Sequence, residues 1–168
     1  MADTNLQVLL RRRPVGAPVP EDFEIVETPV PTPGPGEVLV RARFLSLDPY
    51  MRGRMSEAKS YAQPVPLGGV MEGQTAGEVV ASNAPGFAPG DTVLGGSGWQ
   101  RLSCVAPARL FKVDAQEAPL SASLGVLGMP GLTAWVGLED IGTPKAGETV
   151  VISAASGAVG QVAGQIAK

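Results

Sequence analysis

The chain has 168 residues, of which 44% are hydrophobic, and its mean hydropathy is +0.14. These values fit one ordinary domain plus part of a second and exclude a disordered chain. The formal net charge is -3, which excludes the strongly basic surface that is typical of nucleic-acid-binding proteins.

Glycine and proline are abundant, with 22 and 16 copies, and they spread over the first two thirds of the chain. This pattern is typical of many short strands joined by turns rather than of a helical bundle. The clearest strand is predicted over residues 37–47, where hydrophobic residues alternate, and a tight turn or short helix follows over 48–53. The other expected strands cover residues 6–10, 23–28, 68–73, 75–81, 92–94 and 99–105. Together they predict a small β-barrel or sandwich.

The last third of the chain has a different pattern. Helical segments are expected over residues 121–127 and 132–138, and an apolar strand over 149–153 feeds a glycine turn and a further helix. The predicted domains are therefore residues 1–125, mainly β, and residues 126–168, the beginning of an α/β cofactor-binding domain.

Residue types limit the available chemistry. Cys104 is the only cysteine and there is no histidine, so these residues can form neither an internal disulfide nor a Cys–His catalytic pair. We expect Cys104 to pack as a small apolar residue. The first ten residues do not resemble a signal peptide, and no apolar run reaches the ~18 residues of a membrane helix. We predict a cytoplasmic protein with no membrane partner.

The glycine turn after residue 153 is the strongest local motif. Gly157 and Gly160 are three residues apart, and Gly164 follows four residues later. A phosphate group needs such a close approach to the backbone, and the N–H groups of a helix N-terminus attract its charge. The first glycine of the usual dinucleotide-binding motif is replaced by Ala155, so a tight turn without a ligand remains an alternative.

Four longer stretches resemble one family, the zinc-independent medium-chain dehydrogenases/reductases of the leukotriene dehydrogenase, prostaglandin reductase and curcumin reductase type. The stretches are LSLDPYMRGRM (45–55), LGGSGWQ (94–100), LGVLGMPGLTA (124–134) and AASGAVG (154–160). The resemblance covers essentially the whole chain. It implies a fold class that is mainly β with α, in which a GroES-like barrel, the catalytic domain, precedes the first strand and helix of a Rossmann domain. It also implies an N-terminal fragment of a longer protein, which we expect to be inactive alone.

The implied reaction is reduction by NADP(H) of a carbon–carbon double bond conjugated to a ketone or aldehyde. No metal is expected, because a catalytic zinc needs at least three suitable ligands. A hydrogen-bond donor must then stabilise the negative charge that develops on the carbonyl oxygen.

The resemblance also implies the site residues. Tyr50 and Tyr61 are the expected catalytic residues. Tyr50, Gly95, Gly96 and Trp99 are expected to bind the substrate. The expected cofactor-binding residues are Met129, Gly131, Thr133, Ala154, Gly157, Ala158, Val159, Gly160 and Gln161. Several of them also have a structural alternative, such as core packing for Trp99 or a buried phenol for Tyr50.

Two expectations concern the complete protein. The resemblance implies that the complete protein is a homodimer. It also implies that its substrates are small enones or enals. A protein of a different class, a non-catalytic crystallin-like or nucleotide-binding structural protein on the same fold, is the alternative.

Overall fold

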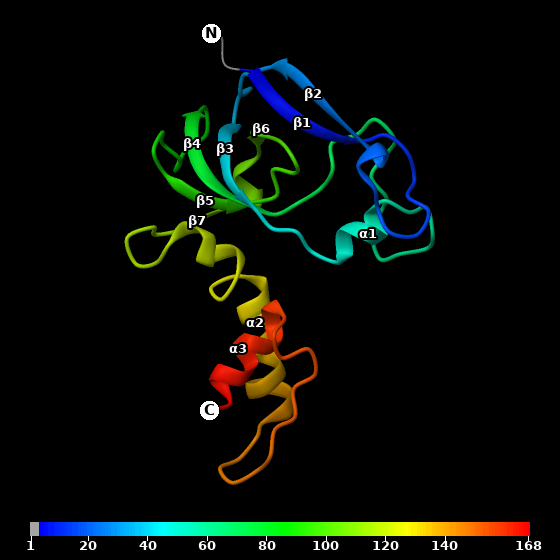
Figure 1. The fold of residues 1–168 in the computed structure, drawn as a ribbon. Coiled ribbons are helices and arrows are strands. Elements are labelled where there is room, and N and C mark those ends of the chain that lie inside the picture. The colour runs from blue at the N-terminus through cyan, green and yellow to red at the C-terminus, as the bar shows by residue number, and fades with distance from the viewer. Residues whose placement is uncertain (1–3) are drawn as a thin grey trace. The chain divides into compact units, whose positions relative to one another are not determined.

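Strands dominate the first two thirds of the chain, interrupted by the short helix α1 (Tyr50–Arg54), and helices follow the last strand (Figure 1). The computed structural model describes residues 4–168 and divides into two units, unit 1 ending at Asp114 and unit 2 running from Ala115 to Lys168. All strands of the described residues lie in unit 1. The predicted boundary after residue 125 lies later in the chain than this division, and the identity of the two domains stays a prediction at this point.

Unit 1 contains two antiparallel sheets. Strands β1 (Thr4–Leu10) and β2 (Phe23–Pro29) form the first, and a 3-10 turn, η1 (Pro20–Asp22), lies between them in the chain. The second has the order β6-β3-β4-β5-β7. Its strands are β3 (Val38–Leu45), β4 (Thr75–Ser82), β5 (Thr92–Gly95), β6 (Leu102–Val105) and β7 (Leu110–Lys112). A 3-10 turn, η2 (Pro107–Arg109), joins the last two.

Strand β3 lies between β4 and β6, and this position explains its burial. Val38, Leu39 and Val40 are all buried, although alternate residues point to opposite faces. Irregularities in the pairing with β4 fall between Leu39 and Val40 and between Ala42 and Phe44. Such bulges increase the local twist and allow a sheet to curve.

Strand β1 connects the two sheets through irregular backbone. Val8 donates its N–H to the Trp99 carbonyl at 2.9 Å and accepts from the Met71 N–H at 3.0 Å. Leu10 donates to the Gly69 carbonyl at 2.9 Å. Through these N–H and C=O groups the strand holds the segments 69–71 and 99–101, of which the first leads into Glu72 and the second contains Trp99.

Two clusters of buried side chains form the core of unit 1. The first comprises Val38, Val40, Val79, Ala84, Val93, Val105 and Leu110. The second comprises Leu10, Met55, Val65 and Met71, with Phe23 and Trp99 packed against it. The second cluster joins β1 to the short helix α1 (Tyr50–Arg54) and to the loop that follows it.

Unit 2 is helical. It contains the 3-10 helix η3 (Leu120–Leu124), α2 (Met129–Trp135), the π-helical turn η4 (Val136–Gly142) and α3 (Ala158–Ile166). Helices α2 and α3 pack against each other. Within the described residues no helix combines the length and apolar character needed to cross a membrane.

Three sequence predictions were wrong or incomplete. The strand predicted over 149–153 does not form, because no other strand in unit 2 offers it hydrogen-bond partners. Residues 68–73 form only an isolated bridge between Val70 and Leu9 instead of a strand. The helix predicted over 121–127 is a 3-10 helix that ends at Leu124, before two glycines. Strand β7 was not predicted, since three residues carry too little periodicity.

Asn5 makes a buried contact that tests how β1 is anchored. It is 1% exposed, accepts a hydrogen bond from the Leu102 N–H at 2.8 Å and donates to the Leu102 carbonyl at 2.9 Å. Asn5→Ala should lower the free energy of unfolding by about 2–4 kcal/mol, because both backbone groups lose their partner in a buried place. Urea titration measures the change.

Asn83→Ala is the matched control. Asn83 also bonds to a backbone carbonyl, that of Pro33 at 2.6 Å, but at an exposed position where water replaces the lost partner. We expect a loss of about 1 kcal/mol or less. Equal losses in both variants would contradict the anchoring role of Asn5.

Candidate functional site

Helix α1 places Tyr50 and Arg54 on one face. Residues four apart on a helix are neighbours, and the Arg54 guanidinium carbon lies 5.8 Å from the centroid of the Tyr50 ring. The same carbon lies 4.5 Å from the centroid of the Tyr61 ring. The structure therefore brings the two predicted tyrosines together on one guanidinium.

Arg54 itself is buried, with a side chain only 7% exposed. Its Nε lies 3.3 Å from the Glu72 carboxylate, and its backbone carbonyl accepts the Val65 N–H at 2.8 Å. A buried charge needs partners, and here the partners are one carboxylate and two aromatic rings. We call Tyr50, Arg54, Tyr61 and Glu72 the phenol cluster.

The two phenols differ in environment. Tyr61 is 84% exposed, whereas Tyr50 is half-buried. Burial raises the pKa of Tyr50, the negative charges of Asp48 and Glu72 raise it further, and Arg54 acts in the opposite direction. The Tyr50 phenol therefore keeps its proton at neutral pH and can donate a hydrogen bond.

Arg52 has a structural role next to this cluster. Its guanidinium donates to the Pro14 carbonyl at 3.0 Å and to the Gly16 carbonyl at 2.9 Å. It thereby fastens the loop before η1 to helix α1.

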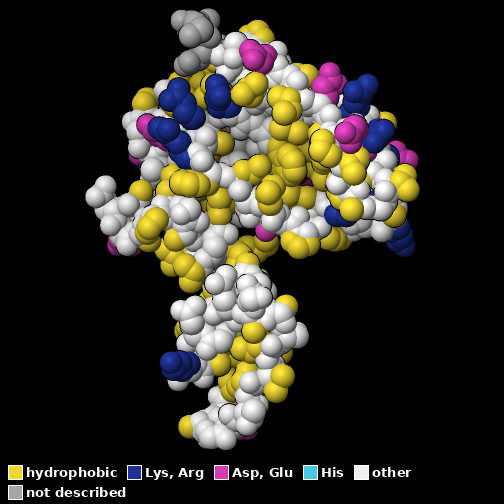
Figure 2. All heavy atoms as spheres, viewed as in Figure 1, with side chains coloured by type: hydrophobic (Ala, Val, Ile, Leu, Met, Phe, Trp, Pro, Cys, Tyr) yellow, Lys and Arg dark blue, Asp and Glu magenta, His cyan; other side chains and the backbone are white. Residues whose placement is uncertain are grey.

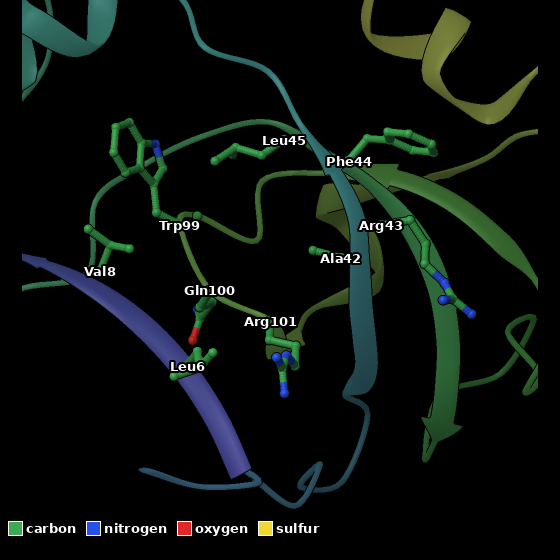
Figure 3. A pocket seen from close by; sticks show the side chains of 10 residues that line it. Leu6, Val8, Ala42, Arg43, Phe44, Leu45, Trp99, Gln100 and Arg101 are labelled. Carbon is green, nitrogen blue, oxygen red and sulfur yellow. The ribbon is translucent and has the colours of Figure 1, made fainter. Parts of the chain in front are cut away.

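Trp99 packs against the second core cluster, which also contains Met55 at the end of α1. Its indole stacks on Phe23, with 5.6 Å between centroids and 21° between planes. It lines a groove of about 360 Å³ between β1 and β3, where Val8 and Leu45 also contribute (Figure 3). The indole Nε1 is buried without a hydrogen-bond partner among the described residues. The groove walls are largely apolar.

Gly95 and Gly96 continue into the loop before Trp99. Gly95 is the last residue of β5, pairs with Leu110 of β7, and accepts a hydrogen bond from the Thr75 hydroxyl at 3.1 Å. The Gly96 carbonyl accepts from Arg109 at 3.3 Å. Both glycines thus have clear structural contacts, and their predicted contact with a substrate stays a prediction.

The predicted cofactor residues of unit 2 lie on α2 and around the start of α3. Met129 begins α2 and is 48% exposed, and the Thr133 hydroxyl donates to its carbonyl at 2.7 Å. Gly131 packs so closely that a Cβ would lie 1.8 Å from the Val126 carbonyl oxygen. Gly131 is therefore required for the packing of α2, independently of any ligand.

The glycine turn forms a cradle of backbone groups. Ala154 has φ of 50°, and its carbonyl accepts the Gly157 N–H at 2.8 Å. A Cβ on Gly160 would lie 2.4 Å from that carbonyl oxygen. Gly157 is the N-cap of α3, and the first intrahelical bond runs from the Gln161 N–H to the Gly157 carbonyl.

This turn fits a dinucleotide phosphate. The N–H groups of Ala158, Val159 and Gly160 precede the first intrahelical bond, so the helix leaves them available to an anion. The side chains at Ala154, Ala155, Gly157 and Ala158 are small or absent, which leaves the backbone of the turn accessible. The predicted binding of a pyrophosphate by residues 157–161 stays a prediction.

Surface charge and metal-binding side chains do not identify a ligand. On the face of unit 1 that Figure 2 shows, several basic side chains gather at the upper left, and basic and acidic side chains lie interspersed at the upper right. Among residues 4–168 no three His, Cys, Asp or Glu side chains gather to hold a metal. Cys104 on β6 is half-buried, and burial followed by the charge of Glu37 raises the pKa of its thiol.

Two members of the phenol cluster were not predicted. Arg52 and Arg54 are close in sequence, a pattern typical of charged residues on the surface. Glu72 is 18 positions after Arg54, too far for a local pattern to link them. The only sequence signal was the spacing of four between Tyr50 and Arg54 on a short helical segment.

The tightness of the glycine turn can be tested with a pair of glycine variants on α3. Gly160→Ala should destabilise unit 2, lowering its free energy of unfolding by about 1–3 kcal/mol, because the methyl group overlaps the Ala154 carbonyl. Gly164→Ala should stabilise it by about 0.5–1 kcal/mol, because its Cβ meets only Ile152 at 3.7 Å. Far-ultraviolet circular dichroism in denaturant measures both, and changes of the same sign would contradict the described turn.

Comparisons with known proteins agree with this architecture. The chain is 55% identical over 164 residues to NADPH-dependent curcumin reductase of Escherichia coli, covering 98% of this chain and 48% of that protein. It is 43% identical over 171 residues to the NADP(+)-dependent 2-alkenal reductase of Nicotiana tabacum, covering 98% of this chain and 50% of that protein. The chain spans about half the length of the curated relatives it matches.

A solved structure, that of CurA from Vibrio vulnificus in complex with NADPH, matches with a TM-score of 0.89 and 50% identity, covering 96% of this chain and 48% of that chain. The predicted fold class, mainly β with a GroES-like N-terminal domain, is confirmed. Residues 6–113 match a family model described as the N-terminal domain of oxidoreductase. The chain therefore belongs to this oxidoreductase family, as its resemblance to the medium-chain reductases predicted.

Proposed function

We propose that the protein carrying this chain is an enzyme that uses NADPH to reduce the carbon–carbon double bond of α,β-unsaturated ketones and aldehydes. The observation that carries the proposal is the phenol cluster, in which a protonated, half-buried Tyr50 lies against a buried guanidinium. The relatives named as curcumin and alkenal reductases support the substrate class.

The chain's own residues supply binding and charge stabilisation. Bound NADPH would supply the hydride that the β-carbon of the substrate receives. As that bond forms, negative charge develops on the carbonyl oxygen, and a phenol can stabilise it by donating a hydrogen bond. We assign this role to Tyr50. A proton from solvent, added at the α-carbon of the enolate, then completes the reduction.

Tyr61 has a separate proposed role. Its exposed ring lies on a loop held by Arg13, which donates to the Val65 carbonyl at 2.7 Å and lies 3.3 Å from the Glu57 carboxylate. From this position Tyr61 would cover the substrate and limit the access of water. Gly95, Gly96 and Trp99 would line the substrate pocket.

In unit 2, the N–H groups of residues 158–160 would hold the pyrophosphate of the cofactor, with Ala154, Gly157 and Gln161 shaping the turn. Met129, Gly131 and Thr133 would lie along the nicotinamide half.

We further propose that the reaction is independent of zinc. The sequence has no histidine, and the described residues bring no three metal-binding side chains together. A phenol then replaces the metal as the group that stabilises the oxygen. A homodimer in the cytoplasm is the proposed state of the complete protein.

Tyr50→Phe in the complete protein tests the central assignment. Loss of the hydroxyl should lower kcat by about 10²-fold, because one hydrogen bond to the developing charge is removed. The decrease in NADPH absorbance with an enone as substrate measures the rate. Ser56→Ala, in the loop that follows α1 and outside the phenol cluster, is the control and should retain full activity.

Two outcomes would contradict the proposal. If the wild-type protein oxidises no NADPH above background with a panel of enones and enals, the non-catalytic alternative replaces it. If Tyr50→Phe is fully active, another group stabilises the oxygen.

The 168-residue chain alone is predicted to bind NADPH poorly. The turn holds only the phosphates, and in a Rossmann domain further strands hold the adenosine half. Calorimetric titration should show no binding in the micromolar range. Micromolar binding would mean that units 1 and 2 together form a sufficient cofactor site.

A further inference from the structure

Arg54 is the most unusual side chain of the chain's described residues. Its guanidinium side chain is only 7% exposed, and its ion-pair partner, Glu72, has a side chain that is 55% exposed. Removing an arginine from water is costly, and a single partner that is still solvated offsets this cost only in part. The Tyr50 and Tyr61 rings supply further stabilisation at 5.8 and 4.5 Å.

A purely structural need would not require this arrangement. The loop after α1 is already fastened by Arg13, through the Val65 carbonyl and Glu57, and by the backbone bond from Val65 to the Arg54 carbonyl. Hydrophobic side chains of similar volume stabilise a core at least as well as a buried ion pair does. Fastening the loop therefore does not by itself account for a buried charge at this place.

We infer that Arg54 is a positioning residue, which orients Tyr50 and Tyr61 on one guanidinium and strengthens Tyr50 as a hydrogen-bond donor, while Glu72 moderates its charge. The inference rests on the proposed function for its catalytic consequence. The coupling between Arg54 and the phenols does not depend on it and can be measured without any substrate.

The physical effect follows from the signs of the charges. A positive charge near a phenol stabilises the phenolate and thereby makes the neutral phenol a stronger donor. Around Tyr50 the charged and titratable groups are Asp48, Glu72, Arg54 and Tyr61. Among them Arg54 alone favours the phenolate, so its removal should raise the pKa of Tyr50, and removal of the Glu72 charge should lower it.

The chain offers a clean readout, because Tyr50 and Tyr61 are its only tyrosines. Incorporation of 3-fluorotyrosine into the 168-residue chain gives two fluorine resonances, which Tyr50→Phe and Tyr61→Phe assign. Titration by nuclear magnetic resonance then reports the pKa of each phenol separately. Fluorination also lowers the pKa of the phenols, which keeps the titration below strongly alkaline pH.

Three variants make the test. Arg54→Met should raise the pKa of Tyr50, and Glu72→Gln should lower it. Glu57→Gln removes an exposed carboxylate that pairs with Arg13 instead, and it should leave both phenols unchanged. If Arg54→Met does not fold, Glu72→Gln carries the test, because Glu72 is on the surface. Phenols that titrate as in the wild type in Glu72→Gln, or in a folded Arg54→Met, would overturn the inference.

Activity of the complete protein supplies the second readout. Arg54→Met should lower kcat by about 10- to 100-fold with a smaller change in KM, because a displaced donor acts mainly on the transition state. Arg54→Lys keeps the positive charge and should restore part of the rate. Full activity in Arg54→Met would overturn the positioning role. If the phenols shift as expected but the wild type reduces no enone, the proposed function fails and the coupling stands.

Discussion

The backbone hydrogen bonds of β1 are the constraint on which unit 1 depends. One edge of this strand pairs with β2, and Val8 and Leu10 also bond to irregular backbone at 69–71 and 99. These segments have no ladder of their own, so their position follows from β1. Glu72 directly follows the first segment, and Trp99 lies in the second. The same strand therefore determines the positions of both residues. The buried Asn5 fixes the strand against Leu102 and thereby holds this arrangement in register.

The phenol cluster depends on a short helix that tertiary contacts hold in place. Helix α1 has five residues, too few to be stable alone, and its position comes from tertiary contacts at both ends. Arg52 holds it from one side through two carbonyls, and Met55 and Met51 are buried beneath it. The rigid core under α1 is what allows a charged side chain to remain buried beside Tyr50.

The sequence predicts the features that depend on neighbouring residues and misses those that depend on contacts between residues far apart in the chain. Most strands of unit 1 were predicted because alternation and turn residues are local signals. The strand over 149–153 was predicted from equally good local signals and does not form, because a strand also needs neighbours. Tyr50 and Tyr61 were predicted through family motifs, but their meeting on Arg54 was not. Burial of Arg54 depends on Glu72 and on a loop closed by Arg13, and no local pattern encodes contacts of that kind.

The distribution of the two tryptophans has a practical consequence. Trp99 lies in unit 1, stacked on Phe23, and Trp135 ends α2 in unit 2, where it is 54% exposed. Indole fluorescence depends on the polarity around the ring, so each unit carries its own intrinsic emission probe. Replacing either tryptophan with phenylalanine leaves a chain whose fluorescence reports one unit alone, and the order in which the two units melt can be read directly from such a pair.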